Sequence, residues 1–300
     1  MSHFEIASVA EPWLLLPFVY SSKKDGVLSE YSHFSAQIAL EDLINNLPGG
    51  ESEYISYLNS FISNIYEALC HNGESYFLDK TPRYYLIIPE IVKIFPDAKF
   101  IFLFRNPIHV YSSIMHTWGA NSFKQLFGNY IDLSDGPKKL SDGYELIKNK
   151  SCAVQYEKFV EAPEEHLKKI LTYLGLGYEE RMLNEILNQK TKGSLGDPTG
   201  INDYKKIEKE TMKKWEKTFS TKFRKFIIRR YVNNLDNNML KTQGYSKNFL
   251  LNEIKTLRPV NKRLLKDSFD YIFFKIIILL NVNLYFGENT KKWLRSKFIS

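Results

Sequence analysis

Two basic residues follow short apolar runs of the sequence, at positions where they could bind an anion. Lys80 comes shortly after the run Tyr76–Leu78, and Arg105 comes directly after Phe100–Phe104. Both runs are rich in aromatic and β-branched residues, which favours buried parallel strands. Ligands of an open α/β sheet bind beyond the carboxyl ends of its strands. Lys80 and Arg105 therefore predict a shared site for an anionic ligand, most simply a phosphate or sulfate ester.

The segment between these two runs is predicted to cross over as a helix. Tyr84–Phe95 is long enough for such a connection, and Pro96-Asp97 marks the turn into the second strand. Pro107 suits the first turn of a following helix, because the N–H group that proline lacks has no helical partner there. The pattern is strand, helix, strand, helix, with a cation after each strand.

Further elements extend this pattern along the chain. Ile6–Ala10 is a short strand candidate followed by Glu11, and Cys152–Tyr156 is another buried strand candidate that ends in polar residues. Helices are expected at Ser35–Ile44, Ser52–His71, Glu164–Leu174, Tyr204–Phe219 and Lys222–Asn234. The order of elements predicts an α/β fold with a central parallel sheet flanked by helices.

The positive charge of the protein lies in its C-terminal segment. The whole chain has a formal net charge of +7, and residues 255–300 alone hold ten basic and three acidic residues. Residues 1–254 are therefore neutral overall, so the charge of the body gives no indication of nucleic-acid binding. We predict one α/β domain over residues 1–250 and a basic, partly apolar helical extension over residues 251–300.

An apolar run lies within this extension, at residues 271–286. A helix that spans a bilayer needs about 20 apolar residues. This run has 16 residues and includes Lys275, Asn281 and Asn283. Two interpretations remain: a helix packed on the domain, or a helix lying in a membrane interface beside its basic flanks. We favour the packed helix, because apolar helix faces more often belong to a core, and leave peripheral membrane contact open.

Cysteine usage and the N-terminal residues bear on the compartment. Cys70 and Cys152 lie in apolar stretches, which predicts buried reduced thiols rather than a disulfide or a metal site. The apolar run Pro12–Tyr20 follows Glu5 and Glu11 and no basic residue, whereas a secretory signal would have the opposite charge. A cytoplasmic location is the default expectation.

In their order along the chain, the polar clusters at the strand ends resemble those of the sulfotransferases that use 3′-phosphoadenylyl sulfate (PAPS), a P-loop-like α/β family. The likeness runs from about Glu5 to Tyr245. It is carried by FLDKTPRYY, FLFRNPIHVYSS and VQYEKF, by a weaker match at KGSLGDP, and by KKWEKTF and QGY. Arg105 and Ser113, eight residues apart, are weak evidence alone. Together with the strand-end lysine upstream and Tyr-Glu downstream they are specific.

The resemblance implies a role for each matched residue. Lys80 would stabilise the charge that develops on the leaving 5′-phosphate. Arg105 and Ser113 would bind the 3′-phosphate, since arginine offers a planar fork of donors and Ser113 would lie in the first turns of a helix. Tyr156 would contact the adenine. A core tyrosine at a strand end stays open as the alternative.

Three further residues take roles from the resemblance. Glu11 resembles the general base of the glycan- and tyrosine-modifying branch of the family. The segment KTPRYY has no histidine where the cytosolic branch places its base, which also favours Glu11. A solvated or helix-capping carboxylate is the alternative for Glu11. Lys192 and Gly193 could close over the 3′-phosphate, with a surface loop as the alternative.

The implied activity is in-line transfer of a sulfuryl group from PAPS to a hydroxyl group, with no metal because cations and backbone amides carry the charge. A carbohydrate acceptor is favoured, and tyrosine in a peptide stays open. Residues 119–150 and the C-terminal tail are expected to shape the acceptor site. A P-loop nucleotide kinase is disfavoured, because no segment resembles GxxxxGK[ST].

One part of the family pattern is missing from the sequence. The family begins with a strand and a PRSGTT-type loop, whose backbone amides hold the 5′-phosphosulfate at a helix N-terminus. Residues 1–8 resemble instead the end of the helix that follows that loop. We expect the coding sequence to begin upstream. The alternative is a non-catalytic remnant with at most weak 3′-phosphate binding, and the upstream nucleotides distinguish the two.

Overall fold

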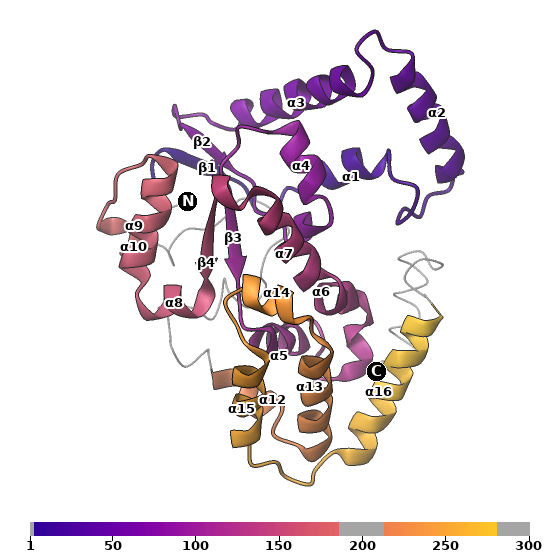
Figure 1. The fold of residues 1–300 in the computed structure, drawn as a ribbon, viewed down its shortest axis with the longest axis vertical. Coiled ribbons are helices and arrows are strands. Elements are labelled where there is room, and N and C mark those ends of the chain that lie inside the picture. Colours follow the sequence, from indigo (N-terminus) through magenta and orange to yellow (C-terminus); the bar gives the residue numbers. More distant parts are fainter. Residues whose placement is uncertain (1–2, 186–212, 281–300) are drawn as a thin grey trace. The chain divides into compact units, whose positions relative to one another are not determined.

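A computed structural model describes residues 3–185 and 213–280 of the chain. Their helices and strands form two compact units (Figure 1). Residues 3–100 and 168–185 belong to unit 1, and residues 101–167 and 213–280 belong to unit 2. The boundaries fall within strand β3 (Phe100–Phe104) and within helix α9 (Pro163–Leu174).

Unit 1 contains a two-stranded parallel sheet. Strand β1 (Ile6–Ser8) pairs with β2 (Tyr76–Leu78), so that Ser8 lies opposite Leu78 at the carboxyl ends of both strands. Both predicted strands are confirmed, although β1 ends at Ser8 rather than at Ala10. Because the strands are parallel, the residues that follow them leave the sheet at the same edge.

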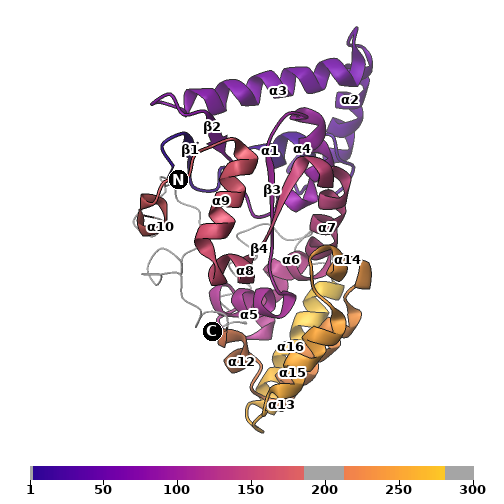
Figure 2. The same ribbon diagram turned by 60° about the vertical axis from the view of Figure 1, so that its left-hand side comes forward.

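The helices of unit 1 are α1 (Leu15–Tyr20), α2 (His33–Asn45), α3 (Gly50–Ala68), the 3₁₀ turn η1 (Tyr84–Leu86), α4 (Ile88–Ile94) and α10 (Arg181–Glu185). The long helix α3 packs against α2 and α4 (Figures 1 and 2). The predicted crossover helix is present as η1 and α4. Pro89 lies in the first turn of α4, where its missing N–H group is tolerated, and this explains the break.

Unit 2 contains the second two-stranded sheet, in which β3 neighbours β4 (Ser151–Gln155). Both predicted strands are confirmed, although β4 begins one residue earlier than expected and Tyr156 already belongs to the following helix. Phe102 and Phe104 are 5% and 2% exposed, whereas Ile101 and Leu103 are 38% and 55% exposed. The prediction that β3 is a buried strand therefore holds for one of its two faces. Alternate residues of a strand point to opposite faces, and only the phenylalanine face is covered by the core.

Helices make up most of the rest of unit 2. They are α5 (Pro107–Thr117), η2 (Phe123–Asn129), α6 (Tyr130–Ser134), α7 (Gly136–Ile147), η3 (Lys148–Lys150), α8 (Tyr156–Glu161), α12 (Lys214–Thr218), α13 (Lys222–Asn234), α14 (Asn237–Thr242), α15 (Lys247–Thr256) and α16 (Leu264–Leu279). Pro107 begins α5, as predicted. Segment 119–150 is largely helical, and it contributes Phe123, Leu126 and Leu133 to the core of this unit.

Helix α16 packs along η2 and also contacts α13, which lies between α15 and α16 (Figure 1). Residues 271–280 therefore pack on the domain through one face of the helix, as we favoured, and the remaining residues 281–286 lie outside the described ranges. Over residues 3–185 and 213–280, no helix combines the length and apolarity that crossing a bilayer requires.

A buried ion pair holds α16 in place. Arg224 on α13 donates from Nε to Asp267 Oδ2 at 2.8 Å and from Nη2 to Asp267 Oδ1 at 3.0 Å. The two residues are 2% and 0% exposed. Arg224 also donates to the side chain of Asn121 at 2.6 Å, and Ser122 donates to Asp270 at 2.7 Å. Removing one partner of such a pair leaves an uncompensated buried charge, which is strongly destabilising.

Candidate active site

Glu11 and Lys80, the two residues predicted to perform the chemistry, form an ion pair in unit 1. Lys80 Nζ lies 2.6 Å from Glu11 Oε1. The side chain of Lys80 is 65% exposed and that of Glu11 is 13% exposed. The register of β1 and β2 explains the pairing, because both residues follow their strands at the same sheet edge. Glu11 is thus neither a solvated carboxylate nor the cap of α1.

Asp79 fixes the turn that follows β2. Its carboxylate accepts hydrogen bonds from the hydroxyl groups of Tyr66 at 2.5 Å, Tyr84 at 2.6 Å and Thr81 at 3.0 Å. Burial and the nearby Asp79 carboxylate raise the pKa of Tyr66, and burial with the hydrogen bond to Asp79 raises the pKa of Tyr84. Both phenols therefore stay protonated as donors. The turn is tied to α3 and to η1 at once.

The backbone after β1 turns sharply at Trp13, which has a positive φ of 54°. Few residues other than glycine occupy this region. The turn lets the Trp13 N–H group donate to Thr81 Oγ1 at 3.2 Å, and the indole Nε1–H group donate to Glu11 Oε2 at 3.4 Å. Strain of this kind costs about 1–3 kcal/mol and persists where the surroundings hold it. Sequence reasoning missed Trp13, because tryptophan gives no signal for a left-handed backbone.

Arg105, at the end of β3 in unit 2, stacks on Tyr156. The guanidinium carbon lies 4.4 Å from the centroid of the Tyr156 ring. Tyr156 begins α8 directly after β4, so neighbouring strands bring the two residues together. Arg105 Nε is buried and has no hydrogen-bond partner among the described residues. Leaving a buried donor unpaired costs about 1–3 kcal/mol. Arg105 Nε is therefore a ready donor for an anionic oxygen.

Two adjacent serines on α5 have different environments. Ser112 is buried, and its hydroxyl group lies 2.6 Å from that of Thr218. Ser113, the predicted ligand of the 3′-phosphate, is half-buried, and its hydroxyl group makes no hydrogen bond within residues 3–185 and 213–280. Ser113 is the serine whose hydroxyl remains available.

Glu157 organises the strand end in unit 2, although its place in the Tyr-Glu motif predicts no separate role for it. Its carboxylate accepts the Asn106 N–H group at 3.0 Å and the Tyr245 hydroxyl group at 2.6 Å, and His109 Nδ1 lies 3.2 Å away. Burial raises the pKa of Glu157, but the adjacent His109 and the hydrogen bonds from Tyr245 and the Asn106 backbone outweigh burial and lower it to about 2. The carboxylate is therefore ionised.

The same turn is fixed from a second side by Asn106. Its side-chain oxygen caps α5 by accepting the Ile108 N–H group at 2.9 Å, and its Nδ2 donates to Glu253 at 3.0 Å. Burial raises the pKa of Glu253. Asn106 itself is 2% exposed. The residue that follows Arg105 is thus held by both its backbone and its side chain.

The QGY segment explains how Tyr245 reaches this turn. Gly244 has a positive φ of 81°, and a side chain at this position would collide with the amide of Gln155. Gln155 lies at the end of β4 and donates to the Gln243 carbonyl group at 2.9 Å. The glycine therefore permits close packing of QGY on the end of β4. The QGY and Tyr-Glu motifs, which are far apart in sequence, form one structural cluster.

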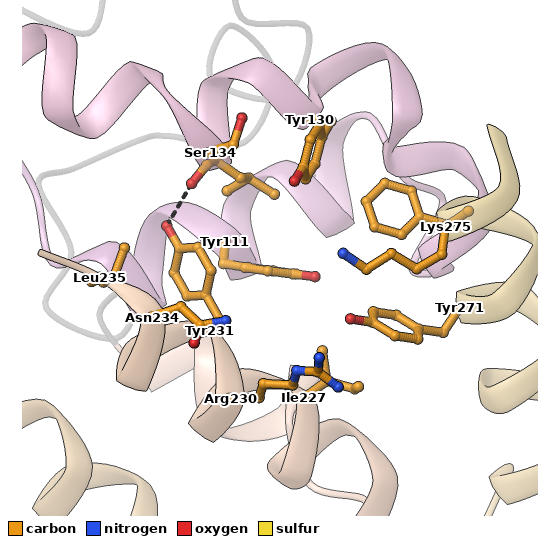
Figure 3. A pocket seen from close by; sticks show the side chains of 12 residues that line it. Tyr111, Tyr130, Ser134, Ile227, Arg230, Tyr231, Asn234, Leu235, Tyr271 and Lys275 are labelled. Carbon is orange, nitrogen blue, oxygen red and sulfur yellow. Dashed lines mark hydrogen bonds between the residues drawn. The ribbon is translucent and has the colours of Figure 1, made fainter. Parts of the chain in front are cut away.

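The cavities are lined by other residues, and two of the predicted site residues are not described by the structure. Lys192 and Gly193 fall outside the described residues. A cavity of about 450 Å³ lies among α1, α2, α3 and α4, and another of about 290 Å³ lies in unit 2 (Figure 3). Neither cavity is lined by Glu11, Lys80 or Arg105. Among residues 3–185 and 213–280, no group of His, Cys, Asp and Glu side chains is arranged to hold a metal ion.

Comparison with known proteins agrees with these motifs. The family model described as "Sulfotransferase family" matches residues 1–180, which is more than half of the chain. The chain belongs to the sulfotransferase family. The family prediction and the α/β fold class are therefore confirmed, and the match includes both strand-end clusters.

The individual relatives share low sequence identity with this chain and match only part of it. Nodulation protein NoeE of Sinorhizobium fredii is 25% identical over 205 residues, which cover 59% of this chain and 45% of NoeE. Omega-hydroxy-beta-dihydromenaquinone-9 sulfotransferase Stf3 of Mycobacterium tuberculosis is 30% identical over 112 residues, 33% of this chain and 28% of Stf3. A candidate protein-tyrosine sulfotransferase of Caenorhabditis elegans is 23% identical over 129 residues, 42% of this chain and 47% of that protein. The chain thus spans less than half the length of each of these relatives.

Proposed function

We propose that the protein transfers a sulfuryl group from PAPS to a hydroxyl group of an acceptor. Membership of the sulfotransferase family supports the reaction class. The observation that carries the donor assignment is Arg105, whose guanidinium is stacked on Tyr156 and whose buried Nε has no partner among the described residues. An oriented arginine with a buried, unpaired donor atom fits a phosphate oxygen well.

Arg105 and Ser113 bind the 3′-phosphate in this proposal. Ser113 adds a hydroxyl group from α5, and the N-terminal end of that helix favours a negative charge. Tyr156 contacts the adenine with the part of its ring that Arg105 leaves uncovered. Asn106 and Glu157 bind no ligand here. They hold the turn that presents Arg105.

Glu11 and Lys80 act on the reacting atoms. The acceptor oxygen forms a bond to sulfur while the bond between sulfur and the bridging oxygen of the 5′-phosphate breaks. Glu11 takes the proton of the acceptor hydroxyl group, and Lys80 stabilises the negative charge on the leaving phosphate. Their ion pair must open first. Lys80 is the partner that moves, because its side chain is 65% exposed whereas Glu11 is 13% exposed.

The proposed acceptor is a carbohydrate hydroxyl group. The names of two relatives point to other hydroxyl-bearing acceptors. These are an omega-hydroxy menaquinone derivative for Stf3 and protein tyrosine for the Caenorhabditis protein. Assays with one acceptor of each class, in the presence of PAPS, separate these alternatives. Sulfation of the carbohydrate alone supports the proposal, and sulfation of the lipid or the peptide alone replaces it.

Calorimetry with 3′-phosphoadenosine 5′-phosphate tests the donor site without requiring an acceptor. We expect the parent chain to bind and Arg105→Ala to weaken binding by roughly tenfold or more, as for loss of a charge-assisted contact. The matched control is Arg229→Ala, an exposed arginine on α13, which should bind like the parent. Absence of binding by the parent would overturn the donor assignment.

The role of Glu11 is tested separately from binding. Glu11→Gln keeps the size of the side chain but cannot accept the proton, so turnover should fall by about 10²- to 10⁴-fold. Donor affinity should stay within about threefold of the parent value, because Glu11 does not contact the 3′-phosphate side in this proposal. Equal losses of turnover and affinity would contradict the assignment. Donor binding without turnover on any acceptor would indicate a binding protein rather than an enzyme.

A further inference from the structure

The outward face of α16 carries a continuous apolar stripe. Its members recur at alternating intervals of four and three residues, which places them on one side of the helix. They are Leu265, Phe269, Ile272, Ile276 and Leu279, and their exposed fractions are 87%, 67%, 59%, 48% and 84%. A contiguous exposed apolar surface of this kind marks an interaction site, whereas isolated exposed apolar residues need no explanation.

The opposite face of α16 is the face that joins the core. Phe274 is 3% exposed, and Asp267 and Asp270 are 0% and 4% exposed. Asp267 pairs with Arg224, and Asp270 accepts a hydrogen bond from the hydroxyl group of Ser122. The stripe is therefore additional to the packing surface of the helix. Both carboxylates of α16 are also turned away from the stripe.

The exposed charges around the stripe are basic. Lys266 and Lys275 are the exposed charged residues of α16, and helix geometry places them on opposite flanks of the stripe. Lys262 is exposed shortly before the helix begins. Neither lysine of α16 forms an ion pair within the described part of the chain. The outward side of α16 thus combines an apolar centre with cationic edges.

A cavity of about 290 Å³ adjoins the Lys275 flank of the stripe. Figure 3 shows the ammonium group of Lys275 and the guanidinium group of Arg230 pointing into the same space from α16 and α13, toward the hydroxyl groups of Tyr111 and Tyr271. Lys275 Nζ lies 5.8 Å from the centroid of the Tyr271 ring. Two cations and two phenols directed into one hollow provide donors for the oxygens of a phosphate group.

We propose that α16 seats unit 2 on an anionic lipid bilayer. The apolar stripe lies in the boundary between headgroups and acyl chains, with the helix axis in the membrane plane. The cavity formed with Arg230 receives the phosphate of an acidic lipid, and Lys275 and Lys266 contact further headgroups. The positive charge beside the stripe favours a lipid bilayer as the partner of this surface. A second copy of the chain would bring like cations face to face along the stripe, which is unfavourable, whereas acidic lipids neutralise them.

Vesicle flotation with the full chain tests the proposal, and it does not depend on sulfuryl transfer. The probes are vesicles of phosphatidylcholine alone and vesicles that also contain phosphatidylglycerol. We expect binding to the anionic vesicles that weakens as salt is added, and little binding to the neutral ones. Inorganic phosphate should weaken binding no more than sodium chloride of the same ionic strength does, because the stripe requires a bilayer. Equal binding to both vesicle types would overturn the role of charge.

Substitutions separate the stripe from the cations. Phe269→Glu with Ile272→Glu should reduce vesicle affinity by at least about tenfold, since both side chains would leave the acyl boundary. Phe249→Glu is the matched control, because Phe249 is 54% exposed on α15, on the other side of α13. Lys266→Gln and Lys275→Gln should each cost roughly fivefold on anionic vesicles. These exposed positions should leave the unfolding temperature unchanged.

Two results would contradict the membrane assignment. In the first, the parent fails to bind vesicles and sediments as a dimer that Phe269→Glu with Ile272→Glu converts to a monomer. The stripe would then be an interface between copies. In the second, the stripe variant folds and still binds anionic vesicles as the parent does, which would place the lipid contact elsewhere on the chain.

Discussion

The hydroxyl group of Tyr245 donates a hydrogen bond to Glu157 at 2.6 Å, although the two residues are 88 positions apart. The same carboxylate accepts the N–H group of Asn106, the residue directly after Arg105. One half-buried acid thus joins the turn after β3, the first turn of α8 and the QGY segment. The orientation of Arg105 depends on this cluster as much as on β3 itself.

This arrangement makes Glu157 a source of acid sensitivity. Its pKa is lowered to about 2 in the folded protein, against about 4.3 in an unfolded chain. A carboxylate whose pKa is lowered by folding stabilises the fold at pH values above its pKa in the unfolded chain. This stabilisation is lost as the pH falls through its pKa in the folded protein. With allowance for its partial exposure, the carboxylate should contribute about 2 kcal/mol at neutral pH. Glu157→Gln should therefore flatten the fall in unfolding free energy between about pH 5 and pH 2.

Urea unfolding at a series of pH values measures this contribution. The matched control is Glu161→Gln, an exposed glutamate at the end of the same helix. The control should keep the pH slope of the parent. If Glu157→Gln also keeps that slope, Glu157 is not the group whose protonation destabilises the fold.

Tyr84 tests the anchoring of the Lys80 turn in unit 1. Tyr84→Phe removes the donor to Asp79 and the acceptor for the Leu15 N–H group. A hydrogen bond to a charged group contributes about 1.5–3 kcal/mol, so the free energy of unfolding should fall by about that amount. Turnover should fall as well, because Lys80 follows Asp79 directly. The measurements are urea unfolding and a sulfation assay.

Tyr31→Phe provides the comparison for Tyr84→Phe. Tyr31 is 63% exposed in the same unit, and its substitution should change neither quantity. Loss of stability with full turnover in Tyr84→Phe would mean that Asp79 supports the fold without positioning Lys80.

Asp267→Asn should be among the most destabilising single substitutions in unit 2. It leaves Arg224 buried without its counter-charge, which typically costs about 3–5 kcal/mol. Replacing both partners, with Arg224→Met and Asp267→Leu, should recover much of that loss because no charge remains buried. Denaturant unfolding of the single and double variants decides the question. A double variant no more stable than Asp267→Asn would show that shape, rather than charge pairing, dominates this contact.

Arg105→Lys distinguishes a planar fork from a simple positive charge. Lysine keeps the charge but loses both the stacking on Tyr156 and the paired donors of the guanidinium group. Affinity for 3′-phosphoadenosine 5′-phosphate, measured by calorimetry, should therefore fall between those of the parent and Arg105→Ala. Affinity equal to that of the parent would indicate that only the charge at this position matters.

Local sequence was sufficient to predict the elements that carry the site. Tyr76–Leu78 and Phe100–Phe104 are strands with the predicted bounds, because short aromatic and β-branched runs bounded by polar turns have few other stable conformations. Pro107 begins α5 because proline is tolerated in the first turn of a helix but not in its interior. These signals depend on residues close in sequence, so they can be recognised without knowledge of the tertiary contacts.

Contacts between distant segments could not be predicted in this way. The Lys80–Glu11 ion pair depends on the register of β1 and β2, and the cluster at Glu157 depends on where QGY packs. Burial was also misjudged: Leu103 is exposed because, within the described part of the chain, one face of β3 has no covering element, which composition does not reveal. The QGY and Tyr-Glu motifs were visible in the sequence, but their mutual contact was not.

The Arg224–Asp267 pair also determines the rotational orientation of α16 about its own axis. If the helix rotated about its own axis, Asp267 would lose its two hydrogen bonds from Arg224. The charges of both residues would then be unpaired in an apolar environment. The helix therefore has one rotational setting relative to α13. A surface that touches Leu265 and Leu279 would consequently define a fixed tilt for the whole of unit 2, and with it the direction in which α5 points relative to that surface.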